Sequence, residues 1–378
     1  MLALIGGATG LVALHLAVEA AGHARRLRRI PVRIHVNGTR GKTSVTRRLA
    51  AALRAAGVRT MGKITGDEPR IILPDGTEEP IVRRGPARIQ EQVRFVRQAE
   101  ARQVQAIVVE CMALAPELQR VAEERMMRST HGIITNVRPD HFEVMGDSLA
   151  EVADALAATI PHRGVLVTAE RRFFSSLAAR AAERGSRIVP VAAGEGAGGS
   201  APEAEHAAIV ATVLREMGLS VPGGEPVPAE HQRLWRWGRA EGRALLLDAF
   251  SANDPVSTRL LVHGIESHFG LPGPRIALFN HRADRPCRLQ SFAADLRAAG
   301  GFAAVALIGE QSSLARRQFR GVGGEIWDVA RLGATEAALG AISTRVGGGD
   351  FTLVGMGNAK GPGLQWARLF AEKGEPCR

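Results

Sequence analysis

A strand–turn–helix pattern between Val32 and Ser44 constrains the fold of this chain more than any other stretch. The sequence VRIHVNGTRGKTS predicts a short apolar strand at 33–36, a glycine-containing turn at 37–41, and a helix that begins at Lys42. Backbone N–H groups in such a turn point into one concavity, and the helix N-terminus adds partial positive charge there. The pattern therefore predicts a phosphate-binding loop for a nucleotide.

The predicted loop is a shorter variant of the common GxxxxGK[ST] pattern, because Val36 occupies the position of the first glycine. Lys42 supplies a positive charge for the outer phosphates of ATP, and the hydroxyl of Thr43 is placed to bind Mg²⁺. An ordinary glycine turn between a strand and a helix is the alternative. The candidate ATP ligands in the loop are Asn37, Gly38, Thr39, Arg40, Gly41, Lys42, Thr43 and Ser44.

Polar side chains follow the next two buried strands that the sequence predicts. The apolar run 106–109 is typical of a buried parallel strand, and it ends in Glu110. Since open α/β sheets bind ligands at the carboxyl ends of their strands, Glu110 is expected to be a Mg²⁺ ligand that faces Thr43. A capping or salt-bridging glutamate is the alternative. The strand predicted at 131–136 leads into a second polar cluster that contains Asn136, Arg138, Asp140 and His141.

Asp140 and His141 are candidate catalytic residues together with Lys42 and Glu110. A neighbouring aspartate and histidine can carry a metal ion or orient a phosphate. Either residue alone would more often be a structural polar contact. Their expected position at the same sheet edge as Glu110 favours a functional role.

The order of strands and helices predicts two α/β domains. Alternating patterns from residue 32 to about 217 indicate a doubly wound, mostly parallel sheet with a phosphate loop. A flexible loop is expected at 194–200, and a linker rich in proline and glycine at 220–230. A second series from residue 244 predicts a smaller Rossmann-like domain, with polar loops at its strand ends and a cleft between the domains. The expected boundaries are 1–24 for an N-terminal apolar helix, 25–230 for the ATP-binding domain and 231–378 for the C-terminal domain.

The net charge of +11 raises the question of which anionic partner the basic residues would bind. The arginines are scattered along predicted helices and are not clustered with aromatic residues, which argues against nucleic acid. An anionic substrate or an anionic membrane surface fits at least as well, and a bias towards arginine codons is a further explanation. The cysteines, Cys111, Cys287 and Cys377, are far apart, as in a reduced chain that faces the cytosol.

Residues 1–18 are almost wholly apolar and are followed by arginines at 25, 26, 28 and 29. An apolar helix with positive charge after it predicts a membrane anchor, with the rest of the chain on the cytoplasmic face of the membrane. An amphipathic helix that caps the first domain is the alternative.

Five motifs resemble the Mur ligase family of ATP-dependent amide-forming enzymes, in that family's order and approximate spacing. Within the family the chain most resembles the ligase subunits of poly-γ-glutamate synthases, the PgsB/CapB group. The resemblance covers essentially the whole chain and is densest at 32–164. The motifs are GTRGKTS (38–44), Glu110, TNVRPDH (135–141), DAFSANDP (248–255) and NHRADR (280–285).

The resemblance implies that ATP phosphorylates a glutamate carboxylate and that the amine of another glutamate attacks the acyl phosphate. It also implies a glutamate substrate, a poly-γ-glutamate product and a small integral membrane subunit as partners, and it leaves self-association into a homo-oligomer open. Nucleotide contacts from the C-terminal domain are implied for Asn253, Arg282, Asp284 and Arg285. Apart from the resemblance, Lys63, Thr65, Arg138 and Lys360 are candidate substrate ligands, as polar residues in loops at the expected strand ends.

The chain departs from the family pattern at one metal ligand. Many Mur ligases place a carbamylated lysine downstream of the Asp-His pair, but the sequence has no lysine between Lys63 and Lys360. A second metal would therefore use His141 with Asp140, Glu143, water or substrate. A Mur-like ligase for another acid and amino-acid pair is one alternative function. A non-synthetic nucleotidase that regulates a membrane export complex is another.

Overall fold

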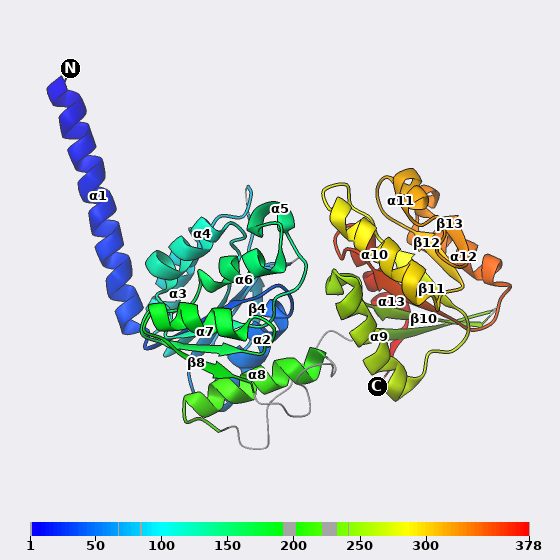
Figure 1. Ribbon diagram of the computed structural model, residues 1–378, viewed down its shortest axis with the longest axis horizontal. Helices are drawn as coiled ribbons and strands as arrows, with labels where there is room; N and C mark the ends of the chain where they lie inside the picture. The colour runs from blue at the N-terminus through cyan, green and yellow to red at the C-terminus, as the bar shows by residue number, and fades with distance from the viewer. Residues whose placement is uncertain are drawn as a thin grey trace. The chain divides into compact units, whose positions relative to one another are not determined.

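The structure is a computed structural model that describes residues 2–66, 68–83, 85–191, 202–220, 233–240 and 242–377. The loop expected at 194–200, and the linker expected at 220–230 except for its first residue, lie outside the described residues. The described residues fall into two compact units, with residues 2–191 and 203–220 in the first unit and residues 233–377 in the second. Each unit contains one mostly parallel sheet with helices packed against it (Figure 1).

The first unit contains an eight-stranded sheet with the order β4-β3-β2-β5-β1-β6-β7-β8. The strands from β2 to β8 in this order pair in parallel, and β3 and β4 extend the sheet as an antiparallel hairpin. The strand that precedes the phosphate loop, β1, is thus central. The strands are β1 (Val32–Asn37), β2 (Thr60–Ile64), β3 (Arg70–Ile72), β4 (Glu78–Pro80), β5 (Ala106–Glu110), β6 (His131–Ile134), β7 (Val165–Thr168) and β8 (Arg187–Pro190).

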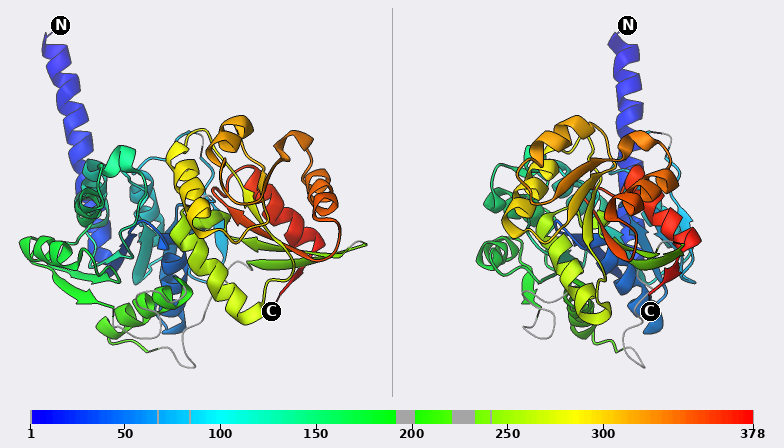
Figure 2. Two further views of the ribbon diagram at one scale, coloured as in Figure 1. Left: turned by 45° about the vertical axis from the view of Figure 1, so that its right-hand side comes forward. Right: turned by 90° about the vertical axis from the view of Figure 1, so that its right-hand side faces the viewer.

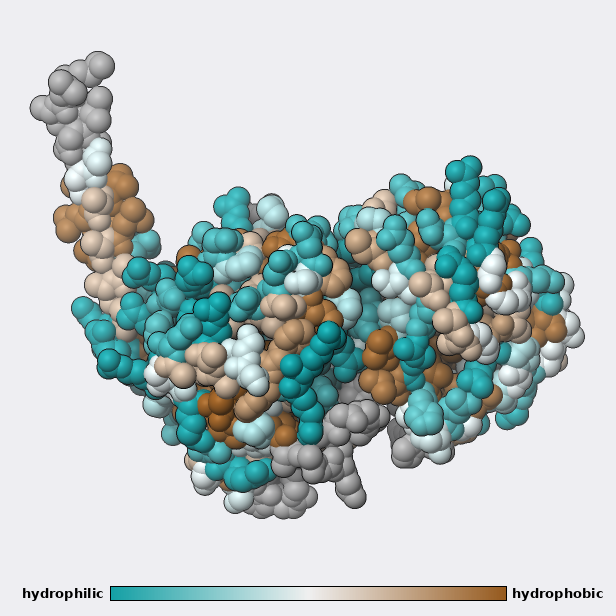
Figure 3. Space-filling model, in the orientation of Figure 1, coloured by the Kyte–Doolittle hydropathy of each residue, from teal (hydrophilic) through white to brown (hydrophobic). Residues whose placement is uncertain are grey.

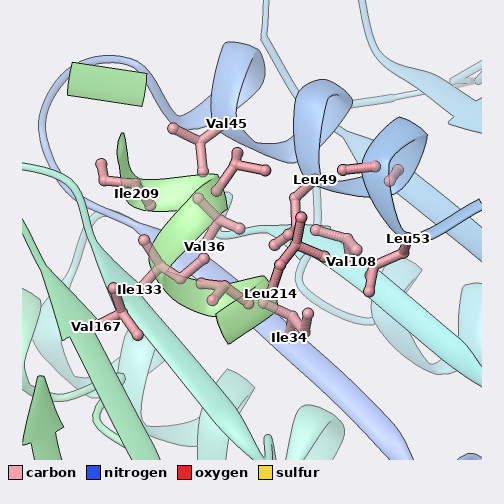
Figure 4. Packing of buried hydrophobic residues seen from close by; sticks show 14 of the residues in the cluster. Ile34, Val36, Val45, Leu49, Leu53, Val108, Ile133, Val167, Ile209 and Leu214 are labelled. Carbon is pink, nitrogen blue, oxygen red and sulfur yellow. The ribbon is translucent and has the colours of Figure 1, made fainter. Parts of the chain in front are cut away.

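Two helices, α2 (Lys42–Ala55) and α8 (Pro202–Glu216), cover one face of this sheet. Figure 4 shows Val45 and Leu49 of α2 and Ile209 of α8 packed on side chains of β1. The spacing of Val45, Leu49 and Leu53 places them on one side of the helix, so the apolar pattern explains this contact. The other face packs against α1 (Leu2–Arg29), α3 (Glu91–Ala101), α6 (Leu149–Ala157), α7 (Phe174–Glu183) and a π-helix (Ala122–Met127). Two short helices, α4 (Pro116–Val121) and α5 (Phe142–Met145), complete the unit.

The structure corrects two helices that the sequence predicts in this unit. Apolar residues at 89, 93, 96 and 99 predict a helix at 86–102, but the helix begins only at Glu91. The residues before it form tight turns, in which the N–H groups of Glu91 and Gln92 donate to the carbonyls of Arg88 and Ile89 at 3.0 Å. The sequence also predicts one helix at 116–127, but in the structure the α-helix changes to a π-helix at Ala122. At the end of this wider turn the N–H of Arg128 donates to the carbonyl of Glu123. The side chain of Glu123 contacts His35 of β1.

The N-terminal helix α1 extends five residues beyond the expected boundary at residue 24. Its last turns belong to the folded unit, because His23 and Leu27 are buried and a ring nitrogen of His23 bonds to the Met126 carbonyl at 2.8 Å. Figure 2 shows in both views that the N-terminal half of α1 extends away from the first sheet. Apolar side chains between Leu11 and Val18 are exposed there (Figure 3).

Among the helices of the described residues, none is both long and apolar enough to cross a membrane. The anchor that the sequence suggests for residues 1–24 stays a prediction.

The second unit contains a seven-stranded sheet with the order β13-β12-β11-β14-β10-β9-β15. The five strands from β13 to β10 are parallel. An antiparallel strand, β9, which the sequence analysis missed, pairs with β10 and carries the short edge strand β15. Alternating Trp235 and Trp237 were the available signal, since a period of two is typical of a strand. The strands are β9 (Leu234–Arg239), β10 (Gly242–Asp248), β11 (Arg275–Phe279), β12 (Ala304–Leu307), β13 (Glu325–Asp328), β14 (Phe351–Met356) and β15 (Glu375–Pro376).

Helices follow the strands of the second unit as the alternating pattern predicts. They cover both faces of the sheet, with separate apolar cores on each side. The helices are α9 (Pro255–Phe269), α10 (Pro286–Ala299), α11 (Ser312–Gln318), α12 (Thr335–Val346) and α13 (Pro362–Lys373), with 3₁₀ turns at Phe250–Ala252 and Ala330–Leu332.

Candidate nucleotide and metal site

The turn after β1 requires glycine at two positions. Gly38 has a φ of 123°, and a Cβ atom built there would lie 2.0 Å from the Thr135 hydroxyl oxygen. Gly41 has a φ of 82°, and its Cβ atom would lie 2.2 Å from Nε2 of His206. Residues with side chains rarely adopt these angles and would also collide with neighbours. The glycines therefore fix a narrow turn that other residues would distort.

The loop after β6 braces this turn through Asn136. The N–H of Thr39 donates to the Asn136 carbonyl at 3.0 Å, and the N–H of Arg40 donates to the Asn136 side chain at 3.1 Å. The Thr39 hydroxyl also donates to Oδ1 of Asn136 at 2.8 Å and accepts the N–H of Arg138 at 2.9 Å. Asn136 and the backbone of Arg138 thus brace the loop, and their roles as ATP and substrate ligands stay predictions.

The start of α2 faces the inside of the turn. Its N-cap is Gly41, and within the described residues no side chain caps the helix. The first N–H groups of a helix have no partner inside the helix, so an anion can accept them. Nζ of Lys42 lies over the loop and donates to the Gly38 carbonyl at 2.6 Å. A loop that combines uncapped helix N–H groups with an ammonium group fits the phosphates of ATP.

A threonine and a glutamate meet beside this loop. The Thr43 hydroxyl donates to Oε2 of Glu110 at 3.1 Å, and the same oxygen accepts the N–H of Thr65 at 2.7 Å. Glu110 is almost fully buried. Mg²⁺ prefers oxygen ligands and usually takes one or two from protein, with water and phosphate completing its shell. The pair Thr43 and Glu110 fits that requirement, and the described residues contain no cluster of three or more His, Cys, Asp or Glu side chains for a metal.

Asp140 and His141 lie beside the loop as predicted, and Arg40 joins them. Nη1 of Arg40 lies 3.0 Å from Oδ2 of Asp140, and Nε2 of His141 lies 3.7 Å from the same oxygen. Nδ1 of His141 lies 3.1 Å from Oε1 of Glu143. His141 has a φ of 48°, a left-handed conformation that turns its ring back towards the acids on both sides. Asp140 therefore lies between Arg40 and His141 and contacts both.

Lys63 occupies a different place from the one expected for a substrate ligand. Its side chain is almost fully buried, and its Nζ atom lies 3.3 Å from Oε2 of Glu91. Burial lowers the pKa of Lys63, while the Glu91 carboxylate opposes this change. Glu91 also accepts two bonds from Arg83, at 2.8 and 3.0 Å. Strand alternation explains the separation, because Lys63 points to the face of β2 that packs on α3.

Two polar side chains of β1, Asn37 and His35, have partners inside the domain. Nδ2 of Asn37 donates to Gln119 at 2.7 Å and to Thr159 at 3.0 Å, so this predicted ATP ligand points into the domain. Nδ1 of His35 lies 2.8 Å from Glu123 in a fully buried pair. Burial alone would lower the pKa of His35, but neighbouring Cys111 and Glu123 together raise it to about 10.

Three residues near the loop were missed by the sequence analysis. Glu170 accepts the N–H of Val137 at 2.8 Å, which fixes the loop after β6. His206 of α8 lies against Gly41, and Glu205 accepts a bond from Asn136 at 3.4 Å. Burial raises the pKa of Glu205, while the charge of Arg138 opposes that rise. No spacing links α8 to the loop in the sequence, so only the folded chain reveals this contact.

The second unit brings its three polar loops together. Nδ2 of Asn280 donates to the carbonyls of Asn358 and Lys360 at 2.6 and 2.8 Å. Nη1 of Arg288 donates at 2.6 Å to both Asn253 and Asn358. Of the predicted ligands, these bonds involve the side chain of Asn253 and the backbone carbonyl of Lys360, whereas Arg288 was not predicted. On the same loop Arg282 donates to Asp284 at 2.7 Å, Nε of Arg285 lies 3.9 Å from Asp284, and Lys360 is exposed.

Comparison with protein families finds two matches that together cover most of the chain. Residues 36–218 match the Mur ligase middle domain. Residues 235–373 match the C-terminal domain of poly-gamma-glutamate synthase CapB.

Two curated proteins are similar to this chain in sequence. The chain is 33% identical over 319 residues to the capsule biosynthesis protein CapB of Bacillus anthracis, covering 78% of this chain and 67% of that protein. It is 38% identical over 174 residues to the PGA synthase CapB of Bacillus subtilis, covering 46% of this chain and 44% of that protein. The chain thus spans less than half the length of the second relative in that alignment.

Solved structures share the fold at low identity. The structure of Escherichia coli FolC with ADP has a TM-score of 0.67 at 15% identity, covering 93% of this chain and 92% of that one. A folylpolyglutamate synthase/dihydrofolate synthase with Mn, AMPPNP and L-glutamate bound has a TM-score of 0.66 at 16% identity, with the same coverage. At this identity the likeness concerns the fold alone.

Proposed function

Because the chain belongs to the Mur ligase family and has a C-terminal domain of the CapB type, we propose that it is an ATP-dependent amide ligase of poly-γ-glutamate synthesis. The substrate carboxylate belongs to a glutamate or to the end of a polyglutamate chain. The amine of another glutamate forms the new amide bond. ADP and inorganic phosphate are the other products.

The single observation that supports this proposal best is the contact between Thr43 and Glu110 beside Lys42. A free carboxylate is a poor electrophile at neutral pH, so it must first receive a phosphoryl group. Mg²⁺ and ATP supply the charge neutralisation and the phosphoryl group for that step. In this chain Thr43 and Glu110 would hold the metal ion.

The other residues of the site position and neutralise the reacting groups. Lys42 would release the Gly38 carbonyl and bind the outer phosphates, because a charged acceptor attracts an ammonium group more strongly than a carbonyl does. The paired Arg40 and Asp140 would hold His141 near the transferred group. When the amine attacks the acyl phosphate, a C–N bond forms, the C–O bond to phosphate breaks, and the amine loses a proton to a nearby base. Catalysis in such a site consists mainly of positioning and charge neutralisation.

We also propose that α1 keeps the enzyme at the cytoplasmic face of a membrane, beside a small integral membrane subunit. Exposed apolar residues between Leu11 and Val18 support this, since a soluble monomer rarely exposes such a row. Arginines 25, 26, 28 and 29 follow and would meet anionic lipid head groups.

The test is a product assay with full-length protein, ATP, Mg²⁺ and glutamate. Release of ADP in step with γ-amide bonds, measured by mass spectrometry of the oligomer, is the expected result. Release of ADP without any amide would contradict the proposal and favour a regulatory nucleotidase. Amide formation with another acid or amino acid, but not with glutamate, would favour a ligase of different specificity.

A further inference from the structure

A cavity of about 540 Å³ lies at the opposite end of α2 from the nucleotide loop. It forms where α2 ends, where β2 begins and where the turn between β3 and β4 folds over both. Three arginines, Arg54, Arg59 and Arg102, contribute to its lining. We propose that this cavity binds an anion with several carboxylate or phosphate oxygens.

Arg54 is the central residue of the proposed site. Its Nη1 atom is buried and has no hydrogen-bond partner among the described residues. Burial lowers the pKa of Arg54, while the charges of Asp75 and Glu78 oppose this change. The turn lies directly on the guanidinium group, since a Cβ atom on Gly76 would be 3.3 Å from Nη2. A buried cationic donor without an acceptor is unfavourable, so an anion that reaches this group would stabilise it.

One acidic residue, Asp75, lines the cavity, and a second, Glu78, acts on Arg54 through its charge. Asp75 accepts the N–H of Thr77 at 2.9 Å and its hydroxyl at 2.7 Å. Glu78 accepts two bonds from Arg47, at 2.8 and 2.9 Å. These bonds occupy the carboxylates within the turn and between β4 and α2. Because three arginines and one aspartate are the charged residues of its lining, the cavity has an excess of positive charge.

The other two arginines frame the cavity from the adjoining elements. Nε of Arg59 donates to the Arg102 carbonyl at 3.0 Å, which fixes the Arg59 side chain beside the end of α3. Apolar side chains of Val58, Leu73 and Pro74 complete the lining. The combination suits a ligand with anionic groups on an apolar chain.

Guanidinium groups recognise carboxylates and phosphates through paired N–H donors. If the proposed function is correct, both kinds of anion arise in the reaction. A γ-linked glutamate oligomer carries α-carboxylates along a methylene chain and would contact the arginines and the apolar lining. Inorganic phosphate would contact the arginines alone.

The experiment measures binding to the full-length protein by titration calorimetry without ATP, at constant ionic strength. The probes are a γ-linked glutamate hexamer and inorganic phosphate. The variants are Arg54→Gln and the pair Arg59→Gln with Arg102→Gln, which changes exposed side chains and tests the site even if Arg54→Gln fails to fold. The matched control is Arg94→Gln with Arg97→Gln, because these arginines are exposed on α3 outside the cavity lining.

We expect saturable binding that the cavity variants weaken about ten-fold or more and the control leaves unchanged, because a charge-assisted bond is lost. Specific binding of the hexamer identifies the product chain as ligand, and specific binding of phosphate alone identifies the small anion. Equal weakening by the control, or no saturable binding of either probe, would overturn the site. The amide-forming assay on the same preparations reports the proposed function separately, so either proposal can fail alone.

Discussion

The hydroxyl of Thr43 donates to the carboxylate of Glu110 across 3.1 Å, although the two residues are 67 positions apart in the chain. The contact exists because β1 and β5 pair in parallel with Val36 opposite Glu110. The helix that carries Thr43 begins five residues after β1 ends. Parallel register thus brings a hydroxyl and a carboxylate to one point at the sheet edge.

Replacement of Glu110 by glutamine should raise the Mg²⁺ concentration that gives half-maximal activity by about ten- to hundred-fold. Loss of a group that orients a metal ligand typically weakens metal affinity by a similar factor. The amide keeps the shape of the side chain but lacks its charge. Direct Mn²⁺ titration of the protein with a non-hydrolysable ATP analogue measures the same loss without turnover. Exposed Glu117→Gln is the control. An unchanged metal titration would indicate that Glu110 has a structural role only.

Replacement of Lys42 by alanine should reduce turnover by a factor of about 100 or more, because a charge that stabilises the transition state is lost. Lys373→Ala is the matched control, since that lysine is exposed and lies 3.6 Å from Glu336 on the second unit. The rate of ADP release measures both variants. A Lys42→Ala enzyme with half the normal rate would exclude the phosphate role.

Replacement of Asn136 by alanine should lower the free energy of unfolding by about 1–3 kcal/mol, because buried donors of Thr39 and Arg40 lose their acceptor. ATP affinity should fall as well, since the loop loses its brace. Urea unfolding and nucleotide titration measure the two effects, and exposed Gln98→Ala serves as control. Full ATP affinity in Asn136→Ala would show that the turn holds its shape alone.

The buried pair of His35 and Glu123 should make stability depend on pH. Because the folded-state pKa of about 10 lies above the ordinary value of 6.5, protonated His35 stabilises the fold fully below pH 6.5. This stabilisation is lost as the pH rises through about 10. NMR titration of the His35 ring reports the pKa directly. The urea concentration at the unfolding midpoint should decrease from pH 6 to pH 8 and again from pH 8 to pH 10. A ring that titrates near pH 6 would contradict the assignment.

Truncation of α1 should separate membrane association from folding. Deletion of residues 2–18 leaves His23 and Leu27 in place, so the thermal midpoint should stay unchanged while sedimentation with membranes is lost. Deletion of residues 2–27 removes the buried Leu27 and should cost about 2 kcal/mol of stability or more. Sedimentation and thermal unfolding measure both proteins. Continued membrane association of the shorter truncation would assign the attachment to another surface.

The sequence by itself determined the elements of the site. Alternating strands and helices predicted the parallel sheets, and glycines and a lysine after β1 predicted the phosphate loop, because these signals are local. Glu110 and Asp140 were predicted at the right edge, since the carboxyl ends of parallel strands meet there.

Only the tertiary structure decided which side chains meet. The direction of Lys63 towards Glu91, the brace of Asn136 and the approach of His206 depend on packing between segments distant in the chain. The same is true of the cavity at Arg54, which requires α2, α3 and the β3–β4 turn to converge. Local patterns report periodicity and turns, but contacts between distant segments depend on register and packing, which no short stretch of sequence contains.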